Sequence, residues 1–246
     1  MKIISEKKDN VYWLTLNRED KANAIDIEMW KGLKNYLEDA SNDQDIRIVA
    51  ITGKGRYFSA GEDLNDLYSA SSLDASLSLF IKHIKPVFDI IVKSGKVITA
   101  VVNGAALGVG VELVLACDLA IAHSESYFML SQGRVGVGPA LALSLAPTSV
   151  SRKRMIEMLL TSKKVDAKLA LQWGLINDIY IDDAEGKVKS WAKEIGKVPE
   201  SLVKITKERL SKHLYNFDYD SSFREIAEYV LTKETKEGIK SFLERK

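Results

Sequence analysis

The sequence predicts an α/β fold, in which parallel strands alternate with helices and a C-terminal region made mainly of helices follows. Short β-rich runs alternate with segments of helical periodicity through the first half of the chain, which is typical of parallel pairing in an α/β layer. Helical patterns predominate from Ala140 onward, with one short extended piece at LINDIYI. No low-complexity linker separates the two parts, and 246 residues suit one domain or one domain with a smaller appendage.

The elements of the first part follow from the period of the apolar residues. VYWLTLN (11–17) is a compact β-rich run, and residues 26–40 place apolar side chains on one helical face behind Asp26, a predicted N-cap. IRIVAITGKG (46–55) is almost continuously apolar and ends at glycines, as expected of a strand buried on both faces. A helical region is predicted over roughly residues 73–93.

The same alternation continues beyond residue 95. The strand KVITAVVNG leads into a glycine-rich stretch, a helix predicted to begin at about Val109, and the strand LAIAHS. Further on, the helix that begins near Asp166 is predicted to end at Gly174, since glycine readily takes the left-handed conformation of a helix end. The later helices are charged on one side and modestly apolar on the other, which suits packing against another surface, such as a second subunit.

The composition argues against several kinds of partner. The 35 basic and 34 acidic side chains nearly cancel, so no overall field attracts nucleic acid or an anionic membrane. No run approaches the ~18 apolar residues of a membrane span, and the N-terminus has no apolar stretch long enough for a signal peptide. We therefore expect a cytoplasmic protein. The single Cys117 excludes an internal disulfide and a cysteine-based zinc cluster, and its apolar flanks indicate a small core residue.

Common nucleotide, metal and hydrolase motifs are missing from the sequence. GVGVEL lacks the third glycine of a dinucleotide fingerprint, and TGKGRYF lacks the Ser or Thr of a P-loop. There is neither an HExxH motif nor the GxSxG turn of a serine hydrolase. The glycines therefore need another explanation.

Glu112 stands in the apolar run VVNGAALGVGVELVLACD. A buried, unpaired carboxylate costs several kcal/mol or becomes protonated, so we expect a raised pKa for Glu112 or a compensating partner. Glycines after a strand let the backbone approach closely and leave N–H groups free at a helix N-terminus, where they can stabilise an oxyanion. The chain has two such segments, YFSAGEDL and NGAALGVGVEL. Each could supply one amide to the same oxygen, with Glu112 about one turn into the second helix.

These two segments resemble the paired signatures of the enoyl-CoA hydratase/isomerase family, the crotonase superfamily. The resemblance continues in order through LTLNREDKANAI, ITGKGRYFSAGEDL, VITAVVNGAALGVGVELVLACDLAIA, SYFMLSQGRVGVGPA, LQWGLINDI and the tail EGIKSFLERK. It implies a crotonase-type spiral of ββα repeats over residues 1–185, with a C-terminal helical region over 186–246 that covers the active site and supports oligomerisation. It also implies an acyl-CoA substrate, no separate cofactor, no metal, and a homotrimer or hexamer.

The resemblance also implies roles for individual residues. The backbone N–H groups of Glu62 and Val109 match the oxyanion hole for the thioester carbonyl, and Glu112 matches the first of two catalytic glutamates. Glu19 stands where the family usually has a proline. Arg18, Lys21 and Lys54 are candidates for the CoA phosphates. The wall of the CoA-binding channel is matched by Ala22, Ala24, Ala60, Asp63 and Leu64.

The second glutamate of the hydratases is replaced in this chain. FMLSQG puts Ser131 and Gln132 where the family has Pro-Glu. A glutamine can hold a water or a carbonyl group but cannot exchange a proton, so Gln132 is predicted to be the polar partner of Glu112. The position that carries an acid in the isomerase subgroup matches Ala140. The side chain of Glu62 is an alternative second acid.

The expected function is therefore an acyl-CoA enzyme that forms an enolate-type intermediate, either an enoyl-CoA isomerase or a hydratase weakened by the lost glutamate. Two alternatives stay open. One is a decarboxylase or hydrolase on the same scaffold, with Tyr68 or His83 opposite Glu112. The other is a catalytically silent acyl-CoA-binding protein, in which Glu112 is a structural residue satisfied by backbone amides or a buried arginine.

Overall fold

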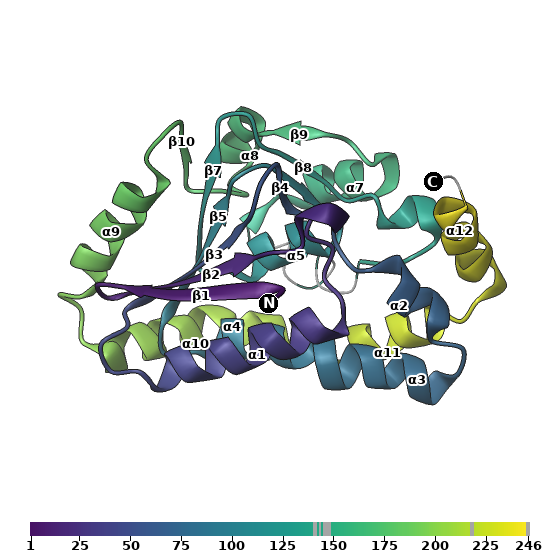
Figure 1. The fold of residues 1–246 in the computed structure, drawn as a ribbon, viewed down its shortest axis with the longest axis horizontal. Helices are drawn as coiled ribbons and strands as arrows, with labels where there is room; N and C mark the ends of the chain where they lie inside the picture. Colours follow the sequence, from purple (N-terminus) through teal and green to yellow (C-terminus); the bar gives the residue numbers. More distant parts are fainter. Residues whose placement is uncertain (140–141, 143, 145–148, 217–218, 245–246) are drawn as a thin grey trace.

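A six-stranded sheet forms the centre of the fold (Figure 1). The computed structural model describes residues 1–139, 142, 144, 149–216 and 219–244. Within the sheet only β1 and β2 are antiparallel, and every other neighbouring pair is parallel, which confirms the predicted α/β class. The strands, in their order across the sheet, are β1 (Ile3–Lys8), β2 (Val11–Leu16), β3 (Ile48–Gly53), β5 (Val97–Val102), β7 (Leu119–His123) and β10 (Asp178–Tyr180).

A second sheet of short strands lies beside the first. Three times, a strand of the large sheet is followed directly by a strand of the small one, so that β3–β4, β5–β6 and β7–β8 form repeated pairs with helical segments after them. This is the ββα repeat that the family resemblance implied. The small sheet was not predicted from the sequence because strands of two or three residues show no period, and the six-residue β1 was not predicted either. The small sheet consists of β4 (Tyr57–Ser59), β6 (Ala105–Leu107), β8 (Tyr127–Met129) and β9 (Val165–Asp166).

Among the helices of the first part, α1 begins where its predicted capping residue indicates. Asp26 accepts a hydrogen bond from Met29 N–H at 2.9 Å and caps α1, as expected. The helical region predicted near residues 73–93 is interrupted by a π-helical segment, Ser78–Ile84. The helices are α1 (Ile27–Asn42), α2 (Leu64–Ser69), α3 (Leu73–Leu77), α4 (Lys85–Lys93) and α5 (Val109–Ala116), with a 3₁₀ turn at Glu19–Lys21.

The later part of the chain is helical, as predicted. Asp166 caps α8, and Gly174, with φ of 79°, ends it. In Figure 1, α9 lies at one end of the molecule and α12 at the other, while α10 runs along the same side of the sheet as α1 and α4. The elements are a 3₁₀ turn (Gln132–Val135), α7 (Arg152–Thr161), α8 (Ala167–Trp173), α9 (Ala184–Ile195), α10 (Glu200–Asn216), α11 (Tyr219–Tyr229) and α12 (Lys233–Leu243). No described helix is long and apolar enough to cross a membrane.

Helix α5 is enclosed by the fold, since each of its eight residues is buried. The apolar core around it includes side chains from the helices near the C-terminus, among them Phe223, Val230 and Ile239. The helices after residue 185 therefore pack into the same core as the strands. A division at 185/186 stays a prediction.

An ion pair ties α10 to the strands. The buried Lys207 Nζ lies 2.7 Å from Asp118 Oδ2, on a side chain that is 23% exposed, and donates hydrogen bonds to the carbonyl oxygens of Lys96 and Ile91 at 2.7 and 3.1 Å. The same Asp118 oxygen accepts a hydrogen bond from Ile98 N–H at 2.7 Å. The Lys207 ammonium therefore has partners, which a buried charge requires if it is not to destabilise the fold.

Replacing Lys207 by Met should lower the free energy of unfolding by about 1–3 kcal/mol, because a buried charged donor loses its hydrogen bonds to Asp118 and to two carbonyl oxygens. Denaturant unfolding at matched protein concentration measures this difference. Lys204→Met is the control, since Lys204 is exposed on the same helix and its loss should cost less than ~0.5 kcal/mol. Equal effects of the two substitutions would show that the ion pair contributes nothing.

Candidate active site

One cavity brings together the residues predicted for the oxyanion hole, the acid/base pair and the wall of the CoA channel. Its volume is about 890 Å³, and its wall comes from the loop after β2, the β4–α2 segment, the start of α5, the segment after β8, and helices α11 and α12. The roles of the predicted site residues stay predictions, but the fold brings these residues together at one cavity. The predicted residues in the wall are Ala22, Ala24, Ala60, Glu62, Asp63, Leu64, Val109, Glu112 and Gln132.

The loop after β4 lies directly against the start of α5. A Cβ on Gly61 would stand 3.3 Å from Val109 N and 3.0 Å from the carbonyl oxygen of Leu107, so only a glycine leaves this contact undisturbed. Gly61 also has φ of 100°, which L side chains rarely adopt. A Cβ on Gly110 would come within 2.8 Å of the Ser59 carbonyl oxygen. Two glycines therefore allow the end of β4 and the first turn of α5 to touch through their backbones.

Two backbone N–H groups at this contact have no acceptor among the described residues. Residues Ile25 and Glu62 form an isolated parallel bridge, whose hydrogen bonds are donated by the N–H groups of Ile25 (2.8 Å) and Asp63 (2.9 Å). The Glu62 N–H is therefore not used in that bridge. Val109 is the first residue of α5, so its N–H has no helical acceptor four residues earlier. Both residues line the cavity.

Glu112 lies in the first turn of α5 and is 5% exposed. Its Oε1 accepts a hydrogen bond from Ala142 N–H at 2.8 Å. This contact is the kind that a structural role would require, and it also holds the carboxyl group in one orientation. The N-terminal turn of a helix stabilises a carboxylate through the helix dipole. Glu112 is therefore both buried and positioned at the cavity wall.

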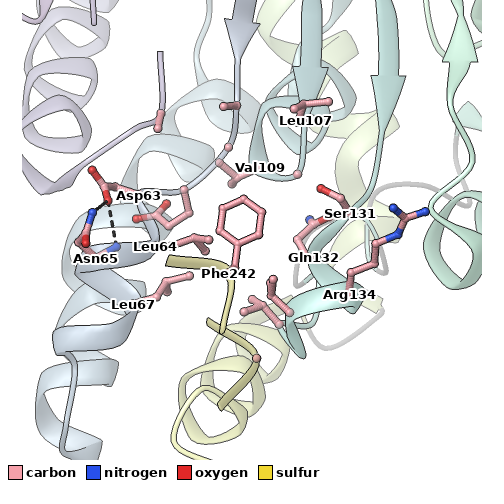
Figure 2. Close-up of a pocket in the computed structure, with 18 of the residues that line it drawn as sticks. Asp63, Leu64, Asn65, Leu67, Leu107, Val109, Ser131, Gln132, Arg134 and Phe242 are labelled. Atoms are coloured by element: carbon pink, nitrogen blue, oxygen red, sulfur yellow. Dashed lines mark hydrogen bonds between the residues drawn. The ribbon is translucent and has the colours of Figure 1, made fainter. Parts of the chain in front are cut away.

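Gln132 lies on the 3₁₀ turn after β8, opposite the start of α5 (Figure 2). A Cβ on Gly108 would lie 3.6 Å from its side chain, so the amide group stands next to the residue that precedes Val109. Both amide atoms, Oε1 and Nε2, are buried and have no hydrogen-bond partner among the described residues. Buried amides without partners are rare in native proteins, and at a cavity wall they indicate a place where a ligand or a water binds.

The comparison with known proteins agrees with this arrangement. The sequence model of the enoyl-CoA hydratase/isomerase family matches residues 6–246. The chain belongs to this family.

Relatives in the family carry out different reactions. The chain is 30% identical to (E)-benzylidenesuccinyl-CoA hydratase of Thauera aromatica, with 100% of this chain and 97% of that protein covered. It is 28% identical to enoyl-CoA delta isomerase 3 of Mus musculus, a peroxisomal protein, with 99% and 78% covered. The crystal structure of an enoyl-CoA hydratase/isomerase from Mycobacterium paratuberculosis superposes with a TM-score of 0.88 at 25% identity, covering 98% of each chain.

Arg18, a candidate for the CoA phosphates, is held by groups of the fold itself. Its guanidinium lies 2.6 Å from Asp63 Oδ2 and 3.0 Å from the Ala24 carbonyl oxygen, and Arg18 is not among the described residues that line the cavity. Burial alone would raise the pKa of Asp63, but hydrogen bonds from Asn65 and Arg18 outweigh it and lower the pKa. Arg18 therefore fixes the channel wall. Lys21 lines the cavity, whereas Lys54 is exposed and is not among the described residues of the wall.

The turn around Glu19 is built without the family's usual proline. The 3₁₀ turn there ends at Ala22 and Asn23, which have φ of 51° and 55°. The fully buried Asn23 amide donates to the carbonyl oxygens of Lys54 and Tyr57 at 2.9 and 2.8 Å. The role of Asn23 was not predicted from the sequence. It holds this turn through carbonyl groups that lie more than thirty residues away along the chain.

The residues proposed for other reactions of the scaffold lie elsewhere. Neither Tyr68 nor His83 is among the described residues that line the cavity, and Tyr68 is 42% exposed. Burial raises the pKa of the Cys117 thiol, in agreement with a core residue rather than a nucleophile. Ala140, the position compared with the isomerase subgroup, lies outside the described residues.

Helix α12 forms part of the cavity wall, which the sequence indicated only through the family-like tail. Figure 2 shows the Phe242 ring projected between Leu64 and Val109 on one side and Gln132 on the other. Lys236 anchors this helix. Its Nζ donates to three carbonyl oxygens at the end of α2, those of Leu67, Tyr68 and Ala70, at 2.7, 3.0 and 2.7 Å.

Replacing Lys236 by Met should loosen α12 from α2, because three hydrogen bonds from a charged donor are lost. Such bonds stabilise by roughly 1.5–3 kcal/mol each, so amide exchange in residues 233–243 should accelerate at least about tenfold. Hydrogen–deuterium exchange measures this directly. Lys240→Met is the matched control, since its side chain is 58% exposed on the same helix. If both variants exchange like the wild type, Lys236 does not hold the helix.

Proposed function

We propose that this protein binds an acyl-CoA thioester in the cavity and stabilises its enolate. The N–H groups of Glu62 and Val109 act as the two oxyanion donors, and Glu112 acts as the acid/base. The observation that carries this proposal is the meeting of two available N–H groups with one buried carboxyl group at a single contact between the β4 loop and α5. Losing one donor of this kind typically costs ~3 kcal/mol in the transition state.

Isomerisation of an enoyl-CoA is the reaction we propose first. Glu112 removes a proton from C2 of a 3-enoyl thioester, and the negative charge moves onto the thioester oxygen held by the two N–H groups. A proton is then returned at C4, which moves the double bond from the 3,4 to the 2,3 position. One carboxyl group can remove and return the proton, so this reaction does not require the second glutamate that Gln132 replaces.

Hydration of a 2-enoyl thioester is the second candidate. The unpartnered Gln132 amide supports it, because such a group can hold a water beside the substrate. Gln132 cannot exchange a proton, so hydration should be slower than with two glutamates by about 10²–10⁴, the usual value of one general acid/base.

The remaining wall suits the CoA part of the substrate. Ala22, Ala24 and Ala60 are small and leave room for the pantetheine arm, while Asp63 and Leu64 begin α2 beside them. No separate cofactor or metal is part of this proposal.

We also propose a homotrimer or hexamer in the cytoplasm. Apolar side chains on the outer side of α10 support assembly, since Leu202 and Ile205 are 51% and 52% exposed.

Glu112→Gln should abolish turnover while acyl-CoA binding remains. Conjugation formed from a 3-enoyl-CoA, followed by absorbance, should fall at least about 10²-fold, because the amide cannot carry the proton. Loss of conjugation from a 2-enoyl-CoA in the wild type would identify a hydratase instead. Binding without any turnover, unchanged in the variant, would identify a silent acyl-CoA-binding protein.

Gln132→Glu should increase hydration, because it restores a second proton-exchanging group opposite Glu112. We expect a rise of about 10²-fold in the hydration of a 2-enoyl-CoA. Gln132→Ala is the comparison, since it removes the polar group without adding a carboxyl. If neither substitution changes the hydration rate, Gln132 does not face the reacting carbons.

A further inference from the structure

The proposed function uses the backbone of Glu62 and leaves its carboxyl group unexplained. Glu62 Oε2 accepts one hydrogen bond, from Trp30 Nε1 at 2.9 Å. Oε1 is buried and has no partner among the described residues, although part of the residue reaches the cavity wall. A buried charged carboxylate with a single hydrogen bond would be strongly destabilising.

The charged groups around Glu62 do not compensate for such a charge. Asp63 and Asp66, at the start of α2, and Asp26, at the start of α1, all repel a negative charge there. Arg18 is paired with two of these carboxylates, since its guanidinium lies 2.6 Å from Asp63 and 3.6 Å from Asp26. Glu112, on α5, adds another acidic group at the same cavity. Burial first, and then the three aspartates, raise the pKa of Glu62 well above its ordinary value.

We propose that Glu62 is held as a neutral carboxylic acid and serves as the second proton carrier of the site. This inference rests on the proposed function and deepens it. Glu62 follows Gly61, which touches the start of α5, and Glu112 lies three residues after Val109 on that helix. The two carboxyl groups therefore belong to the two segments that meet at the oxyanion donors, so each can serve a different carbon of the acyl group.

The proton balance is complete. The Glu112 carboxylate takes a proton from C2, and the electron pair of that C–H bond enters the dienolate. The dienolate forms a new C–H bond at C4 with the proton of Glu62, which becomes a carboxylate. After the product leaves, water takes the proton from Glu112 and supplies one to Glu62, and both groups return to their starting states.

Trp30 is a positioning residue in this scheme. It is fully buried, packs against Phe88 with ring centroids 5.8 Å apart, and directs its indole N–H at Glu62 Oε2. That bond orients the carboxyl group and lowers its pKa against the larger effect of burial. Glutamine at position 62 can keep this hydrogen bond but cannot donate a proton as an acid.

The transfer test uses a 3-enoyl-CoA deuterated at C2 and follows the label at C4 of the conjugated product. In the wild type the C4 hydrogen comes from Glu62, so C4 should carry little deuterium. In E62Q only Glu112 can return a proton, so deuterium should appear at C4 and kcat should fall about 10²-fold. Equal labelling and equal kcat in the two proteins would overturn the proposal.

The pH profile separates a proton carrier from a structural residue. The wild-type kcat should fall at high pH as Glu62 ionises, and E62Q should lack this fall. W30F should move it to higher pH, because the lost N–H no longer stabilises the carboxylate. A profile that is identical in all three proteins would contradict the role of Glu62.

A stability measurement tests the neutral state without any turnover. The unfolded chain releases the Glu62 proton above about pH 4.3 while the folded protein retains it, so wild-type stability falls as pH rises toward the folded-state pKa. The Tm of E62Q should therefore exceed that of the wild type by a margin that grows as the pH rises above about 5 toward the folded-state pKa of Glu62. Glu38→Gln, at an exposed position on α1, should show no such growth.

The experiments distinguish a failure of the proposed function from a failure of the proposed role of Glu62. If the wild type converts no enoyl-CoA, the proposed function fails while the stability difference of E62Q remains. If the wild type is active and E112Q inactive, but E62Q matches the wild type in labelling, pH profile and stability, only the role of Glu62 fails.

Discussion

The site depends on one close backbone contact, where the loop after β4 meets the first turn of α5. Gly61 and Gly110 permit it, since a Cβ at either position would meet backbone atoms at 2.8–3.3 Å. The contact turns two separate strand ends into one pair of neighbouring N–H groups. It also requires α5 to enter the core, because the helix can reach β4 only from within the fold. The burial of Glu112 follows from that position.

The surroundings shift the pKa values of two neighbouring acidic groups near the contact in opposite directions. Asp63 has an arginine and local amide donors, and its pKa is lowered. Glu62, the residue before it, has one indole N–H, and its pKa is raised. The same short loop therefore carries an ionised carboxylate that fixes structure and a neutral carboxyl group next to the cavity. Pairs of carboxyl groups with separated pKa values are a common basis for dividing acid and base roles.

Much of this arrangement was predictable from local patterns. Asp26 and Gly174 marked helix ends, and the strands of the large sheet at residues 46–53 and 97–102 were recognisable as almost continuously apolar runs. The family resemblance named site residues that converge on one cavity. The small sheet was not predictable, since its strands are too short to show a period. Nor were the pairings of Arg18 with Asp63 and Trp30 with Glu62, because each joins residues more than thirty positions apart.

The anchoring of α12 has a mechanical consequence. Helix α2 has Asp63 as its N-cap, immediately after the Glu62 amide, and the carbonyl groups at its other end hold Lys236. With only six residues, α2 is a short link between α12 and the Glu62 amide. A ligand that displaces the Phe242 end of α12 would therefore act on the Glu62 amide through α2. In the proposed function, the position of the C-terminal helix and the alignment of this oxyanion donor would change together when an acyl-CoA enters the cavity.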